Sequence, residues 1–242
     1  MKYLIRLSFD GTAYCGWQMQ KNGPSVQEQV FRALTTVFGN VQEFSGCSRT
    51  DAGVHALDYC ASFAADSTLP CEKVIAALNA NLPRDIAVHV AEIVPDDFHA
   101  RYSVIKKEYR YRILTTPARS PFWEDRAWHR VGEYDLEALN RAASHLCGTH
   151  DFRSFMAAGS KITDCTRTVF DAHFEQDGDT LSFYVSADGF LYNMVRIMVG
   201  TLLEVPRKYP PEEIKAILEA KNRAAAGATA PARGLYLNRV EY

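Results

Sequence analysis

The amino-acid sequence predicts an α+β fold in two halves, the first with the element order strand–helix–strand–strand–helix–strand. In the first half, segments with alternating apolar and polar residues, typical of half-buried strands, are separated by segments with apolar residues at helical spacing. The second half repeats a similar order of elements without repeating the sequence. This order is that of a ferredoxin-like or RRM-like unit. We therefore expect two antiparallel sheets that form one extended sheet around a central cleft.

The first half starts with an alternating strand over residues 2–9, which ends at the turn signal Asp10-Gly11. A helix follows Ser25, whose hydroxyl can cap it in a capping box with Glu28. The remaining elements of this half are expected as strands at 41–47 and 54–64, a helix at about 71–81 and a strand at 86–94. The Pro95-Asp96-Asp97 stretch then breaks the pattern, so we place the two domains at 1–102 and 103–242.

The second half begins with a strand over 103–114, followed by a loop rich in Pro, Arg and Trp. The elements expected after this loop are a helix at about 135–146, a hairpin of strands at 165–175 and 180–187, helices at 189–203 and 211–221, and a final strand at 234–240. The segment 189–203 is apolar nearly all round, which is typical of a buried helix.

The composition bounds the class of protein. The 242 residues carry 27 Lys and Arg against 29 Asp and Glu, a net charge of −2, so any site for a polyanion must come from local clustering of basic residues. Six cysteines without a CxxC pair favour reduced thiols, and the sequence has neither a signal-peptide core nor a long uncharged apolar run. We therefore expect a cytoplasmic protein. His145, Cys147 and His150 lie close in sequence, but they lack a fourth ligand and we expect no metal there.

The polar, glycine-flanked loop over residues 45–56 is the first candidate for chemistry. A loop fixed at both ends by strands can hold a reactive group still while leaving it reachable. Asp51 is the candidate reactive group, and Arg49 would point to the same side in an extended backbone. The alternative is ordinary: Asp-Ala-Gly is common turn chemistry, and an Arg near an Asp is often a solvated ion pair.

Arg196 is the most informative residue of the second half, because it is a single guanidinium in an otherwise apolar helix. A buried charge without a partner costs several kcal/mol, so Arg196 needs an acceptor, and a carboxylate satisfies it best. We choose Asp51 as that partner, since such a pair would keep the carboxylate ionised and fix its rotamer. A structural salt bridge or an Arg that reaches the surface remains an alternative.

The segment 98–112 supplies local basicity through Arg101, Lys106, Lys107, Arg110 and Arg112, with tyrosines interleaved at 102, 109 and 111. Basic side chains attract phosphates, and tyrosine rings offer a stacking surface to bases. The mixture suits an RNA with an unstacked nucleotide. In a strand, Lys107, Tyr109 and Tyr111 share one face. A solvated strand whose tyrosines belong to the core is the alternative, more so for Tyr111 than for Tyr109.

Together these residues resemble the signature of the TruA-type tRNA pseudouridine synthases. The motifs that carry the resemblance run in order over nearly the whole chain: Phe9-Asp10-Gly11-Thr12, Gly16-Trp17-Gln18, the loop Ser48 to Ala56, Phe98-His99-Ala100-Arg101, Lys107-Glu108-Tyr109-Arg110-Tyr111, Gly189-Phe190-Leu191-Tyr192-Asn193-Met194-Val195-Arg196 and Ala230-Pro231. No motif position that this family uses for chemistry departs from the pattern.

The resemblance implies an isomerase that converts uridine to pseudouridine at positions 38–40 of the tRNA anticodon stem-loop. It implies that Asp51 is catalytic, Tyr109 stacks on the flipped base, Arg196 pairs with Asp51 and Arg49 helps hold the nucleotide out of the stem. Arg101, Lys107 and Arg110 would contribute to substrate binding. The family works as a homodimer on tRNA and needs neither a metal nor an organic cofactor.

Two other functions remain open from the sequence. One is an RNA-binding module without chemistry, because ferredoxin-like sheets commonly bind RNA by stacking. The other is an aspartate-dependent glycosidase or nucleosidase, for which Glu108 or Asp188 would have to serve as the second carboxylate. The sequence decides neither which of the three uridines is preferred nor whether Asp51 attacks the base, attacks the sugar or assists elimination.

Overall fold

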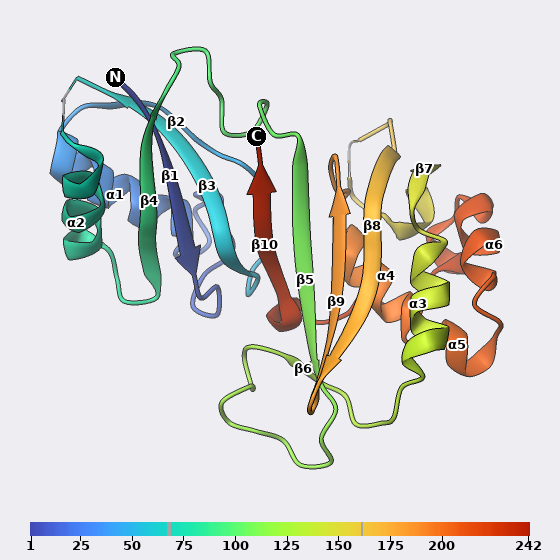
Figure 1. The fold of residues 1–242 in the computed structure, drawn as a ribbon. Helices are drawn as coiled ribbons and strands as arrows, with labels where there is room; N and C mark the ends of the chain where they lie inside the picture. The colour runs from blue at the N-terminus through green and yellow to red at the C-terminus, as the bar shows by residue number, and fades with distance from the viewer. Residues whose placement is uncertain (67–68, 161) are drawn as a thin grey trace. The chain divides into compact units, whose positions relative to one another are not determined.

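The computed structural model describes residues 1–66, 69–160 and 162–242, which form two compact units (Figure 1). The first unit comprises Met1–Ile105 and Tyr236–Tyr242, and the second comprises Lys106–Leu235. The α+β fold class and the antiparallel pairing predicted from the sequence are confirmed within these units. The joining of the two sheets around a cleft stays a prediction.

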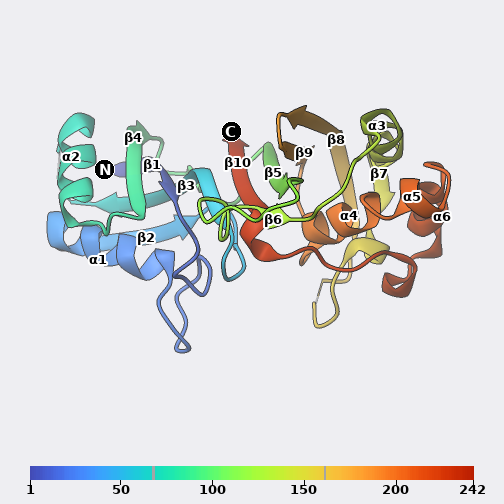
Figure 2. The same cartoon turned by 90° about the horizontal axis from the view of Figure 1, so that it is seen from below.

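The first unit has the ferredoxin-like element order. Its elements are β1 (Lys2–Phe9), α1 (Val26–Phe38), β2 (Val41–Gly46), β3 (His55–Ala65), α2 (Cys71–Asn81) and β4 (Ile86–Val94) (Figure 1). The strand order is β4-β1-β3-β2, with every neighbouring pair antiparallel. α1 and α2 pack against each other, α1 also contacts β2, and α2 also contacts β4 (Figure 2).

Local chemistry explains where α1 begins and what it buries. The Ser25 side chain accepts a hydrogen bond from the Glu28 backbone N–H at 3.3 Å, so the predicted N-cap is confirmed. Val30 and Leu34 of this helix are completely buried, as is Ile5 of β1. The buried apolar side chains of β1 and those at helical spacing in α1 thus build one core.

The last strand, β10 (Leu235–Glu241), pairs in parallel with the start of β3, where Tyr236 lies opposite His55 and Leu237 opposite Ala56. Beyond it, the Tyr242 hydroxyl donates to the Ala100 carbonyl at 2.8 Å. These contacts explain why residues 236–242 belong to the first compact unit, whereas the sequence analysis placed them in the domain 103–242.

The second unit contains β5 (Lys106–Leu114), the short β6 (Trp128–His129), α3 (Leu136–Ser144), β7 (Gly148–Asp151), β8 (Thr166–Asp177), β9 (Thr180–Ala187), α4 (Met194–Leu202), α5 (Val205–Lys208) and α6 (Glu213–Ala220) (Figure 1). Short 3-10 helices cover Arg153–Phe155, Arg223–Ala225 and Ala232–Gly234. The antiparallel order is β5-β9-β8-β7, and β6 pairs in parallel with β5. The helix α3 contacts both α5 and α6 (Figure 2).

The helix predicted over 189–203 starts later than expected, at Met194. The preceding residue, Asn193, adopts the left-handed conformation with φ 59°, so a helix cannot run through it. The prediction of burial is confirmed, because most side chains of α4 are buried. The backbone turn at Asn193 thus separates the Gly189 to Tyr192 segment from the helix that carries Arg196.

Candidate functional site

Asp51 lies half-buried in the loop that joins β2 to β3. At the β2 end of this loop, the Cys47 backbone N–H donates to the Cys60 carbonyl at 2.9 Å, and the Tyr59 hydroxyl donates to the Ser48 carbonyl. At the β3 end, the Val54 N–H donates to the Asp51 carbonyl at 3.2 Å and closes a turn. The aspartate therefore sits between two fixed points.

A second loop, residues 10–18, holds the Asp51 loop from outside. The backbone N–H of Trp17 donates to the Thr50 carbonyl at 3.2 Å, and the backbone N–H of Gly53 donates to the Tyr14 carbonyl at 3.3 Å. Gly16 makes this approach possible, because a Cβ at this position would lie 2.3 Å from the Thr50 oxygen. Its φ of +98° also belongs to the region that favours glycine. The Gly16-Trp17-Gln18 motif therefore helps to position the Asp51 loop.

Aromatic side chains from β1, β3 and the loop over residues 10–18 pack together beside the Asp51 loop. The Trp17 ring stacks on Tyr59 with centroids 3.9 Å apart, and Phe9 packs on Tyr59 at 5.6 Å. Tyr59 is completely buried and Trp17 nearly so. Buried aromatic groups of this size stabilise a loop strongly through their area and ring contacts.

His55 is the first residue of β3, and its contacts hold the end of the Asp51 loop in place. Its Nδ1 accepts a hydrogen bond from the Gly11 N–H at 3.0 Å. The buried ring stacks on Tyr236 with centroids 4.6 Å apart. Asp10 Oδ1 lies 3.2 Å from Nδ1 and accepts hydrogen bonds from the N–H and hydroxyl of Thr12. The Phe9 to Thr12 motif thus also supports the loop.

Among the other residues of the first unit that we predicted to bind substrate, Arg49 is exposed on the loop itself, two positions before Asp51. Arg101 is also exposed, but it lies in the segment that follows β4. That segment is attached near the far end of β3, where the Ala100 N–H donates to Ser62 Oγ at 3.1 Å. The structure therefore places Arg49 at the Asp51 loop and Arg101 away from it.

In the second unit, Tyr109 lies in the middle of β5, opposite Val185 of β9. Tyr109 is 6% exposed, and its ring meets the Phe190 ring edge-on, with centroids 4.9 Å apart and an interplanar angle of 83°. An edge-to-face contact of this kind fixes the orientation of both rings. Phe190 is a site residue that the sequence analysis did not assign, although it is part of the Gly189 to Arg196 motif.

Lys107 and Tyr109 lie on one face of β5, as predicted, whereas Arg110 lies on the opposite face. There the Arg110 guanidinium donates to Ser182 Oγ at 3.0 and 3.2 Å and lies over the Tyr184 ring at 5.2 Å. The structure therefore does not bring Arg110 together with Tyr109.

Arg196 lies one turn inside α4, and its side chain reaches the segment before Pro231. Its Nε donates to the Ala230 carbonyl at 2.7 Å, and its Nη1 donates to Asn193 Oδ1 at 2.8 Å. The Ala230 N–H returns a bond to the Arg196 carbonyl at 3.0 Å. The guanidinium is therefore held in place by its own unit. Its pairing with Asp51, which lies in the other unit, stays a prediction.

Tyr111 is a structural residue of the second unit. It is completely buried, and its hydroxyl donates to the Pro231 carbonyl at 2.7 Å. Burial raises the pKa of Tyr111, while the charges of Arg196 and Arg233 oppose this rise. The phenol therefore stays protonated and remains a donor at physiological pH.

We expect Tyr111→Phe to lower the free energy of unfolding by about 1–2 kcal/mol, because it leaves the Pro231 carbonyl without this donor in the interior. The urea midpoint measures this change, and the exposed Tyr209→Phe is the control, for which we expect no shift. An unchanged midpoint for Tyr111→Phe would show that water or a neighbouring group replaces the bond.

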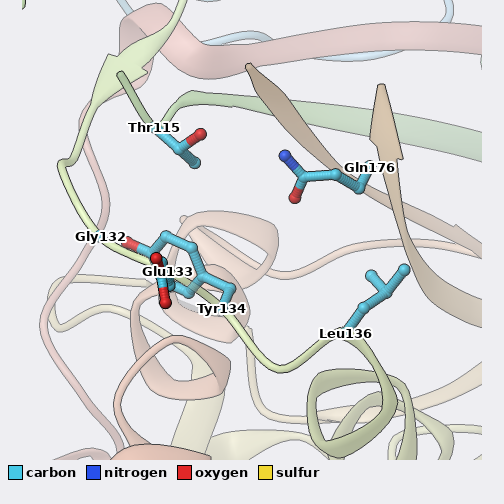
Figure 3. A pocket seen from close by; sticks show the side chains of 6 residues that line it. All are labelled: Thr115, Gly132, Glu133, Tyr134, Leu136 and Gln176. Atoms are coloured by element: carbon cyan, nitrogen blue, oxygen red, sulfur yellow. The ribbon is translucent and has the colours of Figure 1, made fainter. Parts of the chain in front are cut away.

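A pocket of about 350 Å³ lies elsewhere in the second unit (Figure 3). Its lining residues are Thr115, Gly132, Glu133, Tyr134, Leu136 and Gln176. None of these is a predicted site residue. Within the described residues, no group of three or more His, Cys, Asp and Glu side chains could hold a metal ion, and His150 Nε2 instead lies 2.9 Å from the Cys147 carbonyl oxygen. The described helices are all too short or too polar to cross a membrane.

Comparison with known proteins gives a consistent result. Residues 6–103 and 142–242 match the family model described as tRNA pseudouridine synthase. Curated relatives named tRNA pseudouridine synthase A include one from Moorella thermoacetica, 48% identical over 241 residues, and one from Thermoanaerobacter sp. (strain X514), 45% identical over 240 residues. The first alignment covers 98% of both chains, and the second covers 99% of this chain and 98% of the relative. A chain in the crystal structure of a Cbf5-Nop10-Gar1 complex aligns with 14% identity and a TM-score of 0.44 over 98% of this chain, which spans 48% of that one.

Proposed function

Because this chain belongs to the tRNA pseudouridine synthase family and is therefore an isomerase, we propose that it converts uridine to pseudouridine at positions 38–40 of the tRNA anticodon stem-loop, with Asp51 as the nucleophile. In this reaction the bond between N1 of the base and C1′ of the sugar breaks, the base turns, and C5 bonds to C1′. The C5 hydrogen leaves as a proton, and N1 gains one.

The observation that carries the proposal is the way in which Asp51 is held. The loop is anchored to β3 at both ends and to the residues around Gly16 from outside. A carboxylate that attacks a carbon must be positioned to a fraction of an ångström, and a loop that is bonded along its length provides such a position. An exposed aspartate in an ordinary turn would not need this support.

The other predicted residues have roles that suit this chemistry. Tyr109 would stack on the flipped uracil, since Phe190 fixes the orientation of its ring. Arg196, held by Ala230 and Asn193, would pair with Asp51 and keep it ionised. Arg49 would help hold the nucleotide outside the stem. Extrusion of a base costs a few kcal/mol, which stacking and phosphate contacts can offset.

Lys107, Arg101 and Arg110 would contact the tRNA backbone as part of the same proposal. Arg110 lies on the face of β5 opposite Tyr109, so it would contact a part of the tRNA other than the target nucleotide. We further propose that the enzyme works in the cytoplasm as a homodimer, with neither a metal nor an organic cofactor. A carboxylate and a base-gripping pocket are sufficient for an isomerisation that moves no electrons to an acceptor.

The test uses a tRNA transcript labelled with tritium at C5 of uridine, because isomerisation must release that hydrogen into water. Among positions 38, 39 and 40, each of three substrates keeps uridine at one position only. A fourth substrate carries cytidine at all three positions. We expect tritium release from at least one of the first three and none from the fourth. Equal release from the fourth substrate, or none from any, would contradict the proposed site of action.

A further inference from the structure

We propose that Tyr102 and Arg101 form a second contact surface for tRNA, on which an unpaired nucleotide other than the target uridine stacks. This inference rests on the proposed function and adds a substrate contact to it. Tyr102 is 75% exposed, and it belongs to a turn that the structure holds tightly. We call Arg101, Tyr102 and His99 the Tyr102 platform.

The backbone of the platform is held by hydrogen bonds inside the turn. The N–H groups of Tyr102 and Ser103 donate to the His99 carbonyl at 3.1 and 2.9 Å, and the His99 N–H donates to Ser103 Oγ at 3.1 Å. The Arg101 N–H donates to His99 Nδ1 at 3.1 Å. Such a turn loses little conformational entropy when it binds a partner.

The turn is also attached to the sheet of the first unit. The Ala100 N–H donates to the buried Ser62 Oγ of β3 at 3.1 Å, and His99 Nε2 lies 3.3 Å from Ser45 Oγ of β2. The Tyr242 hydroxyl donates to the Ala100 carbonyl at 2.8 Å. The Phe98 to Arg101 motif thus docks on one end of the sheet and presents Tyr102 outward.

The side chains of the platform are arranged as a stacking surface. The His99 ring supports Tyr102 with centroids 4.4 Å apart, and the Arg101 guanidinium lies 5.5 Å from the centre of the Tyr102 ring. These contacts leave three quarters of Tyr102 accessible to solvent. An exposed aromatic ring beside an arginine combines a face for a base with a charge for its phosphate.

The platform is attached to β3 away from His55, the residue at which the Asp51 loop ends. Ser62 lies seven residues beyond His55 along β3, which corresponds to about 23 Å at the rise of a strand. Because the Asp51 loop adjoins His55, we expect the nucleotide on Tyr102 to be a different one. Stacking of unpaired bases on exposed rings is a general mode of RNA recognition, whereas a protein partner would more commonly need a larger apolar patch.

The experiment compares tritium release by the native protein with that by Tyr102→Ala over a range of full-length tRNA concentrations. We expect KM for tRNA to rise about tenfold with kcat unchanged, because stacking adds binding energy far from the reaction. Tyr102→Phe keeps the ring and should retain the native KM. The matched control is Tyr209→Ala, which removes another exposed tyrosine, at the end of α5, and should leave KM unchanged.

A second measurement places a photoreactive benzoylphenylalanine at position 102 of the Asp51→Asn protein, which we expect to bind tRNA without consuming it. We expect a cross-link to a nucleotide outside positions 38–40. An unchanged KM in Tyr102→Ala, a fall in kcat alone, or no cross-link to tRNA would overturn the inference, and the last result would favour a protein partner. Failure of the proposed function is recognised separately, because the native protein would then release no tritium.

Discussion

Asp51→Asn is expected to abolish tritium release from tRNA labelled at C5 of uridine, with a loss of about 10⁴-fold or more in kcat. The amide has nearly the same shape as the carboxylate, so the loop should keep the backbone bonds that fix it at Thr50, Gly53 and Val54. The amide carries no negative charge and is a poor nucleophile, so the chemical step should fail while tRNA still binds. Single-turnover release, together with a filter-binding measurement of Kd for tRNA, separates the two effects.

The matched control is Asp97→Asn, which makes the same change of charge at an exposed position after β4. We expect full activity from this variant. If Asp51→Asn instead lost tRNA binding, the protein would be better described as an RNA binder whose loop carboxylate contacts RNA. If Asp51→Asn released tritium at the native rate, the nucleophile would have to be another group. Release of free uracil by the native protein would indicate a nucleosidase.

The second large effect is expected at Gly16. In Gly16→Ala the new Cβ would lie 2.3 Å from the Thr50 oxygen, and the backbone at φ +98° is unfavourable for any L side chain. We expect the free energy of unfolding to fall by about 3 kcal/mol, from strain and overpacking together. Relief of the clash must displace the residue before Asp51, and a shift of about 1 Å can cost about 100-fold in kcat.

Gly39→Ala separates the clash from the backbone strain. Gly39 also has a positive φ, +71°, but a Cβ there meets nothing within 4 Å. We expect a loss of about 1–2 kcal/mol in the free energy of unfolding and no loss of kcat. Urea unfolding and tritium release measure both variants. Equal activity of the two variants would mean that the Gly16 contact does not position Asp51.

Much of the fold could be predicted from local signals. The strand–helix order of the first unit follows from the two hydrophobic periods, and the N-cap at Ser25 follows from the chemistry of hydroxyl groups. The alternation that places Lys107 and Tyr109 on one face also places Arg110 on the other, a consequence that the sequence analysis did not state. The delayed start of α4 was not predictable, because an Asn in the left-handed conformation leaves no periodic pattern.

The sequence by itself determined the family and the order of elements in the first half, and it predicted the residues on which the chemistry should depend, because periodicity and motif spacing are local properties of the chain. Tertiary structure decided what supports those residues. Gly16 against Thr50, His55 against Gly11, and Phe190 against Tyr109 are contacts between residues 34 to 81 positions apart, as the numbering shows, and no local pattern encodes such distances. For the same reason the parallel pairing of β10 with β3 was not predicted, since the sequence of a strand does not show which strand it pairs with.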